Sequence, residues 1–353
     1  MSKFLVSDRF NLVPYTPGEQ PKDMKYIKLN TNESPYPPSE KAVLYAKKGC
    51  ELSNLYPDPT CSVLSKKLAE FYDVDYENII LTNGSDEALN FSFIAFCNKD
   101  KKAVFPDITY GFYSVFAELN NVPYMEIPLD ENFKIDINKY KNNDSTVFIA
   151  NPNAPTGLIL TISEIEEIVR ANKDNVVVID EAYIDFGGES AIPLTKKYDN
   201  LIVIQTFSKS RSMAGARLGY AIGNKELIKD LNLIKYSTNP YNINRMTMES
   251  ALGILEDNDY VEENLEKIIK TREYTQNELS KLNFEFTDSK ANFVFAKHSE
   301  ISGKYIYEEL KKRGILVRHF DKERIKEYNR ITIGKKEEME ILIKTLSEIL
   351  EEK

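Results

Sequence analysis

The stretch that decides the fold runs Leu201-Ile-Val-Ile-Gln-Thr-Phe-Ser-Lys-Ser-Arg-Ser-Met-Ala-Gly-Ala-Arg-Leu-Gly-Tyr220. Its first four residues are apolar and predict a buried strand, after which the chain becomes irregular and rich in small residues. In an open α/β sheet, a loop of this kind delivers polar groups to the carboxyl end of a strand, where ligands bind. Lys209 stands in this loop beside hydroxyls and an arginine, a setting that can make a lysine an imine-forming nucleophile. Taken alone, however, Lys209 is more simply interpreted as a solvated loop lysine.

Helices and short apolar runs alternate from about residue 62 to residue 235. This alternation predicts an α/β fold with a mostly parallel central sheet flanked by helices. The predicted strands span residues 79–81, 103–105, 146–150, 176–179, 201–204 and 219–222, and the helices between them include 86–96 and 162–172.

The rest of the chain predicts two further parts. Residues 1–45 are rich in proline, tyrosine and asparagine, so we expect an extended N-terminal arm that wraps other structure and forms part of a smaller domain. Residues 46–257 would form the large domain, and residues 258–353 a small C-terminal α+β domain. In the small domain we expect helices over 258–282, near 303–313 and at the C-terminus, and strands near 284–287, 292–295, 315–320 and 330–333.

Bulk composition argues against several classes of protein. The chain has 353 residues and a formal net charge of -9, and its lysines are spread among glutamates, so nucleic-acid binding is not expected. No apolar run approaches the roughly 20 residues of a membrane span, and the N-terminus does not resemble a signal peptide, so we expect a cytoplasmic protein. Three cysteines (Cys50, Cys61, Cys97) and two isolated histidines (His298, His319) predict no metal site.

Asp180 ends the apolar run Asn175-Val-Val-Val-Ile-Asp180 and is followed by Glu-Ala-Tyr183. A buried carboxylate is costly unless it is neutralised or has a cationic partner, and a protonated pyridine nitrogen would be such a partner. Tyr183 can place its phenol in the same crevice. A helix-capping aspartate followed by a core tyrosine explains this segment equally well.

Two further loops follow predicted strands. Asn151 opens the rigid turn Asn151-Pro-Asn-Ala-Pro-Thr-Gly157, where its amide could donate to a ligand oxygen. In Thr82-Asn-Gly84-Ser85-Asp86, the backbone amides at a helix start, with Ser85 as the expected N-cap, favour a phosphate, provided that the carboxylate of Asp86 turns aside. Ordinary turn formation and helix capping are the simpler interpretations of these two loops.

Arg217, with Ser208 and the helix start at residue 85, could hold one phosphate, and Tyr110 could stack on a flat ring. All of these groups fall at the ends of successive predicted strands, where open α/β sheets bind ligands. Together they fit a pyridine that bears a phosphate, a hydroxyl and an aldehyde. That ligand is pyridoxal 5'-phosphate, whose enzymes use a lysine and an acidic partner for the ring nitrogen.

With these motifs, nearly the whole chain resembles the class II, fold-type I pyridoxal-phosphate-dependent aminotransferases. The resemblance rests on the lysine run 206–215, the loop 151–157 and Asp180-Glu-Ala-Tyr183. A looser set of motifs indicates the histidinol-phosphate aminotransferase subfamily: Pro14-Tyr15, Leu29-Asn-Thr-Asn-Glu-Ser-Pro-Tyr36, Tyr56-Pro-Asp58, Gly84-Ser-Asp-Glu87 and Val317-Arg318. Two residues depart from the family pattern, Ala154 in the proline turn and Arg211 where an apolar aromatic is usual, and the sequence does not assign Arg211 a role.

The resemblance implies a role for each matching residue. Lys209 would bind the cofactor covalently and then move protons, with Asp180 and Tyr183 as the other catalytic residues. The residues implied to contact the cofactor are Gly84, Ser85, Asp86, Tyr110, Asn151, Asp180, Tyr183, Thr206, Ser208, Lys209 and Arg217, together with Tyr56 from the partner subunit of a homodimer. Arg330, Arg318, Tyr15 and Asn32 would bind substrate.

The implied reaction transfers an amino group between L-histidinol phosphate and 2-oxoglutarate in histidine biosynthesis. An aromatic amino-acid aminotransferase and a threonine-phosphate decarboxylase share much of the same pattern and remain alternatives. A protein that binds the cofactor without catalysis is disfavoured, because a pure binder needs no nucleophile and electron sink together.

Overall fold

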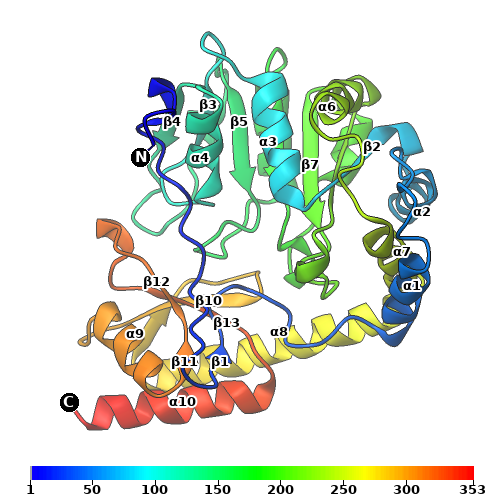
Figure 1. Cartoon of the computed structure of the whole chain (residues 1–353). Coiled ribbons are helices and arrows are strands. Elements are labelled where there is room, and N and C mark those ends of the chain that lie inside the picture. Colours follow the sequence, from blue (N-terminus) through cyan, green and yellow to red (C-terminus); the bar gives the residue numbers. More distant parts are fainter. Residues whose placement is uncertain (1) are drawn as a thin grey trace.

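A seven-stranded sheet forms the centre of the computed structural model, which describes residues 2–353 (Figure 1). Its strand order is β2-β8-β7-β6-β5-β3-β4, and β3 to β7 pair in parallel. Only β8 runs antiparallel to both of its neighbours. The predicted mostly parallel α/β fold is therefore confirmed.

The strands of this sheet are β2 (Ile79–Thr82), β3 (Ala103–Pro106), β4 (Tyr124–Ile127), β5 (Thr146–Ala150), β6 (Val177–Asp180), β7 (Leu201–Thr206) and β8 (Gly219–Gly223). The helices around it are α1 (Glu40–Cys50), α2 (Ser62–Tyr72), α3 (Ser85–Phe96), α4 (Phe112–Leu119), α5 (Ile162–Ala171), α6 (Lys225–Thr238) and α7 (Arg245–Leu255). All six strands predicted in this region are present, with ends shifted by at most two residues. Strand β4 was not predicted, because three of its four residues are exposed and it carries no apolar run.

The central strands are buried on both faces, as their unbroken apolar sequences require. Along β5, Val147 and Ile149 pack into one hydrophobic cluster, whereas Phe148 and Ala150 pack into another. Successive side chains of a strand point to opposite faces, so the sheet separates two cores that the helices close from outside.

A smaller antiparallel sheet, with strand order β12-β13-β10-β9, lies below the large one in Figure 1. It comprises β9 (Phe284–Phe286), β10 (Phe293–His298), β12 (Arg318–His319) and β13 (Asn329–Thr332). Helices α8 (Asn258–Lys281), α9 (Gly303–Lys312) and α10 (Lys336–Glu351) pack with it around a third core. The predicted α+β character of this part is confirmed.

The single strand predicted over 315–320 is wrong. The chain forms two short strands there, β11 (Ile315–Leu316) and β12, which have different partners. Strand β11 pairs in parallel with β1 (Ile27–Lys28) of the N-terminal arm, and β12 pairs with β13. The arm supplies the backbone partner that splits the segment, and a sequence pattern does not reveal such a distant contact.

The start of α3 also differs from the prediction. Ser85 is the first helical residue, and the N-cap is Gly84, whose φ of 75° suits glycine. Ser85 is therefore not the N-cap, and no side chain occupies that role.

The division into arm, large domain and small domain stays a prediction. Helix α1 begins at Glu40 and packs against α7, so it spans the boundary expected after residue 45. Within residues 2–353, no helix combines the length and apolar character needed to cross a lipid bilayer.

Candidate active site

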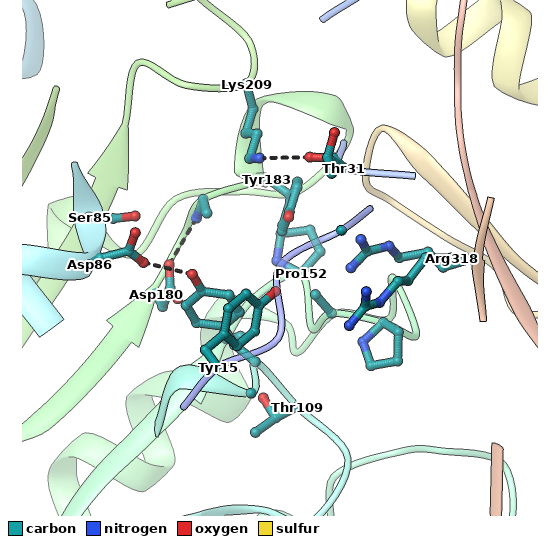
Figure 2. Close-up of a pocket in the computed structure, with 18 of the residues that line it drawn as sticks. Tyr15, Thr31, Ser85, Asp86, Thr109, Pro152, Asp180, Tyr183, Lys209 and Arg318 are labelled. Carbon is teal, nitrogen blue, oxygen red and sulfur yellow. Dashed lines mark hydrogen bonds between the residues drawn. The ribbon is translucent and has the colours of Figure 1, made fainter. Parts of the chain in front are cut away.

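A cavity of about 580 Å³ opens at the carboxyl ends of the parallel strands. The last residues of β3, β5, β6 and β7 line it: Pro106, Ala150, Asp180 and Thr206. The N-terminal arm and the small sheet complete the lining opposite. Figure 2 places Ser85, Asp86 and Asp180 on one side of this cavity and Arg318 on the other, with Lys209 and Tyr183 between them. We call these two sides the cofactor end and the arginine end.

Lys209 reaches this cavity from the loop that follows β7. The loop is closed by a backbone hydrogen bond from the Met213 amide to the Phe207 carbonyl (3.0 Å). The Lys209 amine lies 5.7 Å from the ring centre of Tyr183 and donates to the Thr31 carbonyl at 3.4 Å (Figure 2). A weak bond to a carbonyl leaves the amine able to exchange partners. The Lys209 side chain therefore lines the cavity, and its catalytic role stays a prediction.

Asp180 ends β6 with a side chain that is 5% exposed. Its carboxylate accepts hydrogen bonds from the Tyr113 hydroxyl (3.1 Å) and the Ala182 amide (3.2 Å). Burial raises the pKa of this carboxyl to about 6, although the Tyr113 bond opposes the shift. A buried acid without a cationic partner is expensive, and a positively charged ring nitrogen would remove that cost.

Tyr113 is a site residue that the sequence reasoning missed. It lies in the first turn of α4, is fully buried, and its ring meets Tyr110 edge-on at 5.8 Å. A buried tyrosine usually finds a partner for its hydroxyl, so this position in an otherwise apolar helix was the available signal. The acceptor, Asp180, lies 67 residues away in sequence.

The cofactor end also holds a set of donors for an anion. The first backbone amides of α3, at Ser85 and Asp86, have no partner within their own helix, and the hydroxyls of Thr206 and Ser208 bond to each other nearby (2.9 Å). Arg217 lines the same region and pairs with Asp86 at 3.0 Å.

The carboxylate of Asp86 bonds to other side chains and so leaves the helix start free. A phosphate could bind there only if this negative charge were turned away. Besides Arg217, the Asp86 carboxylate accepts the Tyr110 hydroxyl at 2.7 Å. Gly84 and Gly219 keep the helix start open: a Cβ on Gly219 would lie 2.3 Å from the Ser85 nitrogen, and one on Gly84 would lie 2.4 Å from Arg217 Nη2. Gly219 is therefore required by the close approach of the backbone, and Gly84 by its φ of 75°.

The arginine end is built from three separate segments. Arg330 of β13 packs between Phe293 and Phe320, donates from Nη2 to the Asn30 carbonyl (3.0 Å), and has no partner for Nε among the described residues. Arg318 of β12 donates to the carbonyls of residues 16 and 17. Neither arginine forms a salt bridge in the part of the chain that the structure describes. Two guanidinium groups without carboxylate partners favour an anionic ligand.

Comparison with known proteins decides the family. The family model for aminotransferase class I and II matches residues 24–346. The chain belongs to this family. It is 53% identical to a histidinol-phosphate aminotransferase from Brachyspira hyodysenteriae, covering 99% of both chains, and 53% identical to one from Clostridium beijerinckii, covering 99% of this chain and 98% of the relative. The crystal structure of the histidinol-phosphate aminotransferase from Clostridium acetobutylicum superposes with a TM-score of 0.85 at 27% identity, covering 92% of this chain and 99% of that one.

Aminotransferases of this family depend on pyridoxal phosphate, and the cofactor end fits that group. Arg217, the two hydroxyls and the first amides of α3 match a phosphate. Asp180 matches a protonated ring nitrogen, and the Lys209 amine matches an aldehyde. The structure therefore supports the cofactor assignment independently of the family name.

Four predicted residues lie outside the cavity lining. Two of them contact residues of the lining. Gly84 lies against the Arg217 guanidinium, and the Asn32 amide donates to the Tyr183 hydroxyl at 3.0 Å. Asn151 is 1% exposed, and its side-chain amide both donates to and accepts from the Leu160 backbone. We expected this amide to point into the cavity, but in the structure it bonds within its own loop.

Tyr56 is 78% exposed and stacks on Tyr241 at 4.6 Å, away from the cavity of its own chain. Its contact with a partner subunit stays a prediction. Tyr15 does line the cavity, where it stacks on Phe112 at 4.3 Å.

Proposed function

We propose that the chain transfers an amino group between L-histidinol phosphate and 2-oxoglutarate, the step that the sequence motifs assign to histidine biosynthesis. The observation that carries the proposal is one cavity that holds Lys209 and Asp180 at one end and, at the other, two arginines that form no salt bridge within residues 2–353. The 53% identity to two histidinol-phosphate aminotransferases over nearly the whole chain supports this choice of substrate.

Pyridoxal phosphate, when bound, supplies an aldehyde for amines and a ring that takes up the negative charge left when a proton leaves the amino-bearing carbon. The Lys209 amine would remove that proton from the amino-bearing carbon and deliver it to a carbon of the cofactor. An amine that acts in this way must be mobile, and its weak bond to Thr31 permits this.

Asp180 and Tyr183 support this proton transfer from fixed positions. The Asp180 carboxylate would hold the ring nitrogen and keep it protonated, while the Tyr113 hydroxyl holds the carboxylate in place. Tyr183 is fixed in turn by the Asn32 amide, and Asn32 is held by two hydrogen bonds with the Thr332 hydroxyl (2.9 Å each). These contacts fix Asp180 and Tyr183 in place, whereas Lys209 has only its weak bond to Thr31 and can move.

The arginine end would bind the phosphate of histidinol phosphate and the distal carboxylate of 2-oxoglutarate in turn. Arg330 is half-buried, and desolvation of its guanidinium lowers its pKa, yet an arginine remains charged at neutral pH. A phosphate or a carboxylate that enters the cavity could take two of its donors at once.

We also propose that the active protein is a cytoplasmic homodimer in which Tyr56 completes the partner's cofactor end. In support, the exposed Tyr56 ring stacks on Tyr241, and the segments that carry these two residues expose further apolar side chains, namely Leu52, Leu55 and Met246. The Arg245 guanidinium fixes the Tyr56 carbonyl at 2.9 Å, so the loop presents its ring outward. Light scattering at micromolar concentration should give twice the chain mass of 40.6 kDa.

The substrate is tested with purified protein, pyridoxal phosphate, imidazole-acetol phosphate and glutamate. We expect histidinol phosphate and 2-oxoglutarate to form together. Phenylpyruvate and O-phosphothreonine serve as comparison substrates. Faster turnover of phenylpyruvate would favour an aromatic aminotransferase, and carbon dioxide released from phosphothreonine without an amino acceptor would favour a decarboxylase.

A further inference from the structure

Arg211 is one of the two departures from the family pattern, and the proposed mechanism gives it no role. The structure buries its side chain to 5% exposure and places the guanidinium 5.4 Å from the ring centres of both Phe71 and Phe207. It does not line the cavity, so it does not face substrate. A buried cation is costly unless it is paired, and the pairing indicates what this residue does.

The partner of Arg211 is Asp185. Nη1 of Arg211 lies 3.4 Å from Asp185 Oδ2, and the neighbouring Ser210 hydroxyl donates to the same oxygen. Two consecutive residues directly after Lys209 therefore bind one carboxylate. That carboxylate is 31% exposed, so the cluster lies at the edge of the core.

Asp185 belongs to the segment that carries the other catalytic side chains. It lies five residues after Asp180 and two after Tyr183, in a single turn of 3-10 helix whose other two residues, Ile184 and Phe186, are buried. Backbone hydrogen bonds from Ile184 to Glu181 (3.2 Å) and from Phe186 to Tyr183 (3.2 Å) make this segment continuous with the end of β6. Asp185 is thus rigidly connected to Asp180 and Tyr183.

We propose that Arg211 is a positioning residue for Lys209. Through Asp185, Arg211 and Ser210 tie the lysine loop to the segment of Asp180 and Tyr183, so that the amine keeps its place over Tyr183. The loop is also held by its own backbone hydrogen bonds, by the hydroxyl contact between Ser212 and Ser34 (2.9 Å), and by the Thr247 hydroxyl, which donates to the Ala216 carbonyl (2.8 Å). This inference rests on the proposed function, because it assigns the loop its catalytic lysine.

The test uses the cofactor-loaded protein and three variants. Arg211→Met keeps most of the side-chain volume between the two phenylalanine rings but removes the charge, and Asp185→Asn keeps an acceptor for Ser210 but removes the partner charge. Arg211→Lys keeps a cation that can approach Asp185. Lys141→Met is the matched control, since it breaks an ion pair with Glu167 (2.6 Å) outside the cavity lining.

Two measurements report the position of the lysine. One is the visible circular dichroism of the lysine-bound cofactor, and the other is the maximal rate of amino transfer from glutamate to the cofactor. For Arg211→Met we expect the dichroism to change and the rate to fall about tenfold, because small misplacements of a catalytic group are costly. The glutamate concentration for half-maximal rate should change by less than about twofold, since no substrate contact is lost.

Asp185→Asn should reproduce these effects, and the double variant Arg211→Met/Asp185→Asn should be no slower than the single variants within about twofold. Arg211→Lys should recover part of the rate. The proposal is overturned if the two losses multiply in the double variant, if Arg211→Lys is no better than Arg211→Met, or if Arg211→Met matches the Lys141→Met control. A wild-type protein that binds no pyridoxal phosphate would instead overturn the proposed function.

Discussion

The two ends of the cavity are built in opposite ways. The cofactor end takes its groups from the ends of β6 and β7, from the start of α3 after β2 and from the loop before β8, and its buried carboxylate, Asp180, is held by Tyr113. The arginine end joins β12, β13 and the N-terminal arm, and contacts such as that between Asn32 and Thr332 bridge 300 residues. In Figure 1 the arm descends from beside β4 to the small sheet, where β1 meets β11.

Because of this difference, we expect the cofactor end to determine the chemical step and the arginine end to determine which substrate binds. The cofactor end is fixed by the large sheet, whereas the arginine end depends on how the arm and the small sheet are placed. Substitutions at the first end should change the rate of the chemical step and the binding of the cofactor. Substitutions at the second should change substrate affinity and leave the cofactor bound.

The largest effect is expected for Lys209→Ala. Without the amine, no side chain at the cofactor end can shuttle the proton, and the turnover number should fall by about 10⁴-fold. Steady-state assays with glutamate measure this, and added methylamine should restore part of the rate. Turnover near the wild-type level without an added amine would show that the lysine has no such role.

Arg330→Met should have the next largest effect and should act on substrate. Loss of a charge-assisted contact should lower kcat/KM for imidazole-acetol phosphate about 100-fold, mainly through KM. Cofactor affinity, measured by absorbance titration, should stay within about twofold of the wild type. Arg313→Met is the control, because Arg313 pairs with Glu309 and Glu352 outside the cavity lining. A variant that loses cofactor as well would mean that the two ends are not separate.

Asp180→Asn tests the cost of the buried carboxyl in the cofactor-free protein. A folded-state pKa of about 6, above the unfolded value of about 3.9, means that the folded state binds the proton more tightly. The unfolding free energy of the wild type therefore falls as the pH rises between these two values. The asparagine variant has no carboxyl at this position, so its unfolding free energy does not fall for this reason.

We expect the variant's advantage in unfolding free energy to grow by about 1–2 kcal/mol from about pH 5 to about pH 7.5. Urea unfolding at both pH values measures the difference. Glu181, whose pKa burial raises to about 7, is present in both proteins and cancels in the comparison. A difference that does not change with pH would contradict the burial argument.

Tyr113→Phe should have the smallest effect of the series. It removes one hydrogen bond to Asp180 and leaves the ring in place, so we expect pyridoxal phosphate to bind about fivefold more weakly at neutral pH, equivalent to about 1 kcal/mol. The KM for glutamate should not change, because Tyr113 does not line the cavity. An altered KM with unchanged cofactor affinity would show that Tyr113 acts on substrate binding and not, through Asp180, on the cofactor.

Local sequence patterns pointed to the cofactor end, whereas the arginine end was expected only from the family resemblance, and this difference has a physical reason. Lys209, Asp180 and the α3 start each follow an apolar strand directly, so local patterns place them along the same sheet edge. Tyr113 escaped prediction because its acceptor lies on another element, and Asn151 was misplaced because its amide turns back to Leu160 in its own loop.

The arginine end depends on contacts that no local pattern contains. The split of residues 315–320 into β11 and β12 follows from the pairing of β11 with the arm, and this split sets the place of Arg318. Arg211 could be recognised as unusual from the sequence, but its partner Asp185 became evident only from the packing of two loops.

The most direct test of the account is to find which residue holds the cofactor. The protein is loaded with pyridoxal phosphate, reduced with borohydride to make the link permanent, digested and analysed by mass spectrometry. We predict one modified peptide, with the pyridoxyl phosphate group on Lys209. Modification of another lysine, or none in a protein that has bound the cofactor, would contradict the assignment of this cavity as the active site.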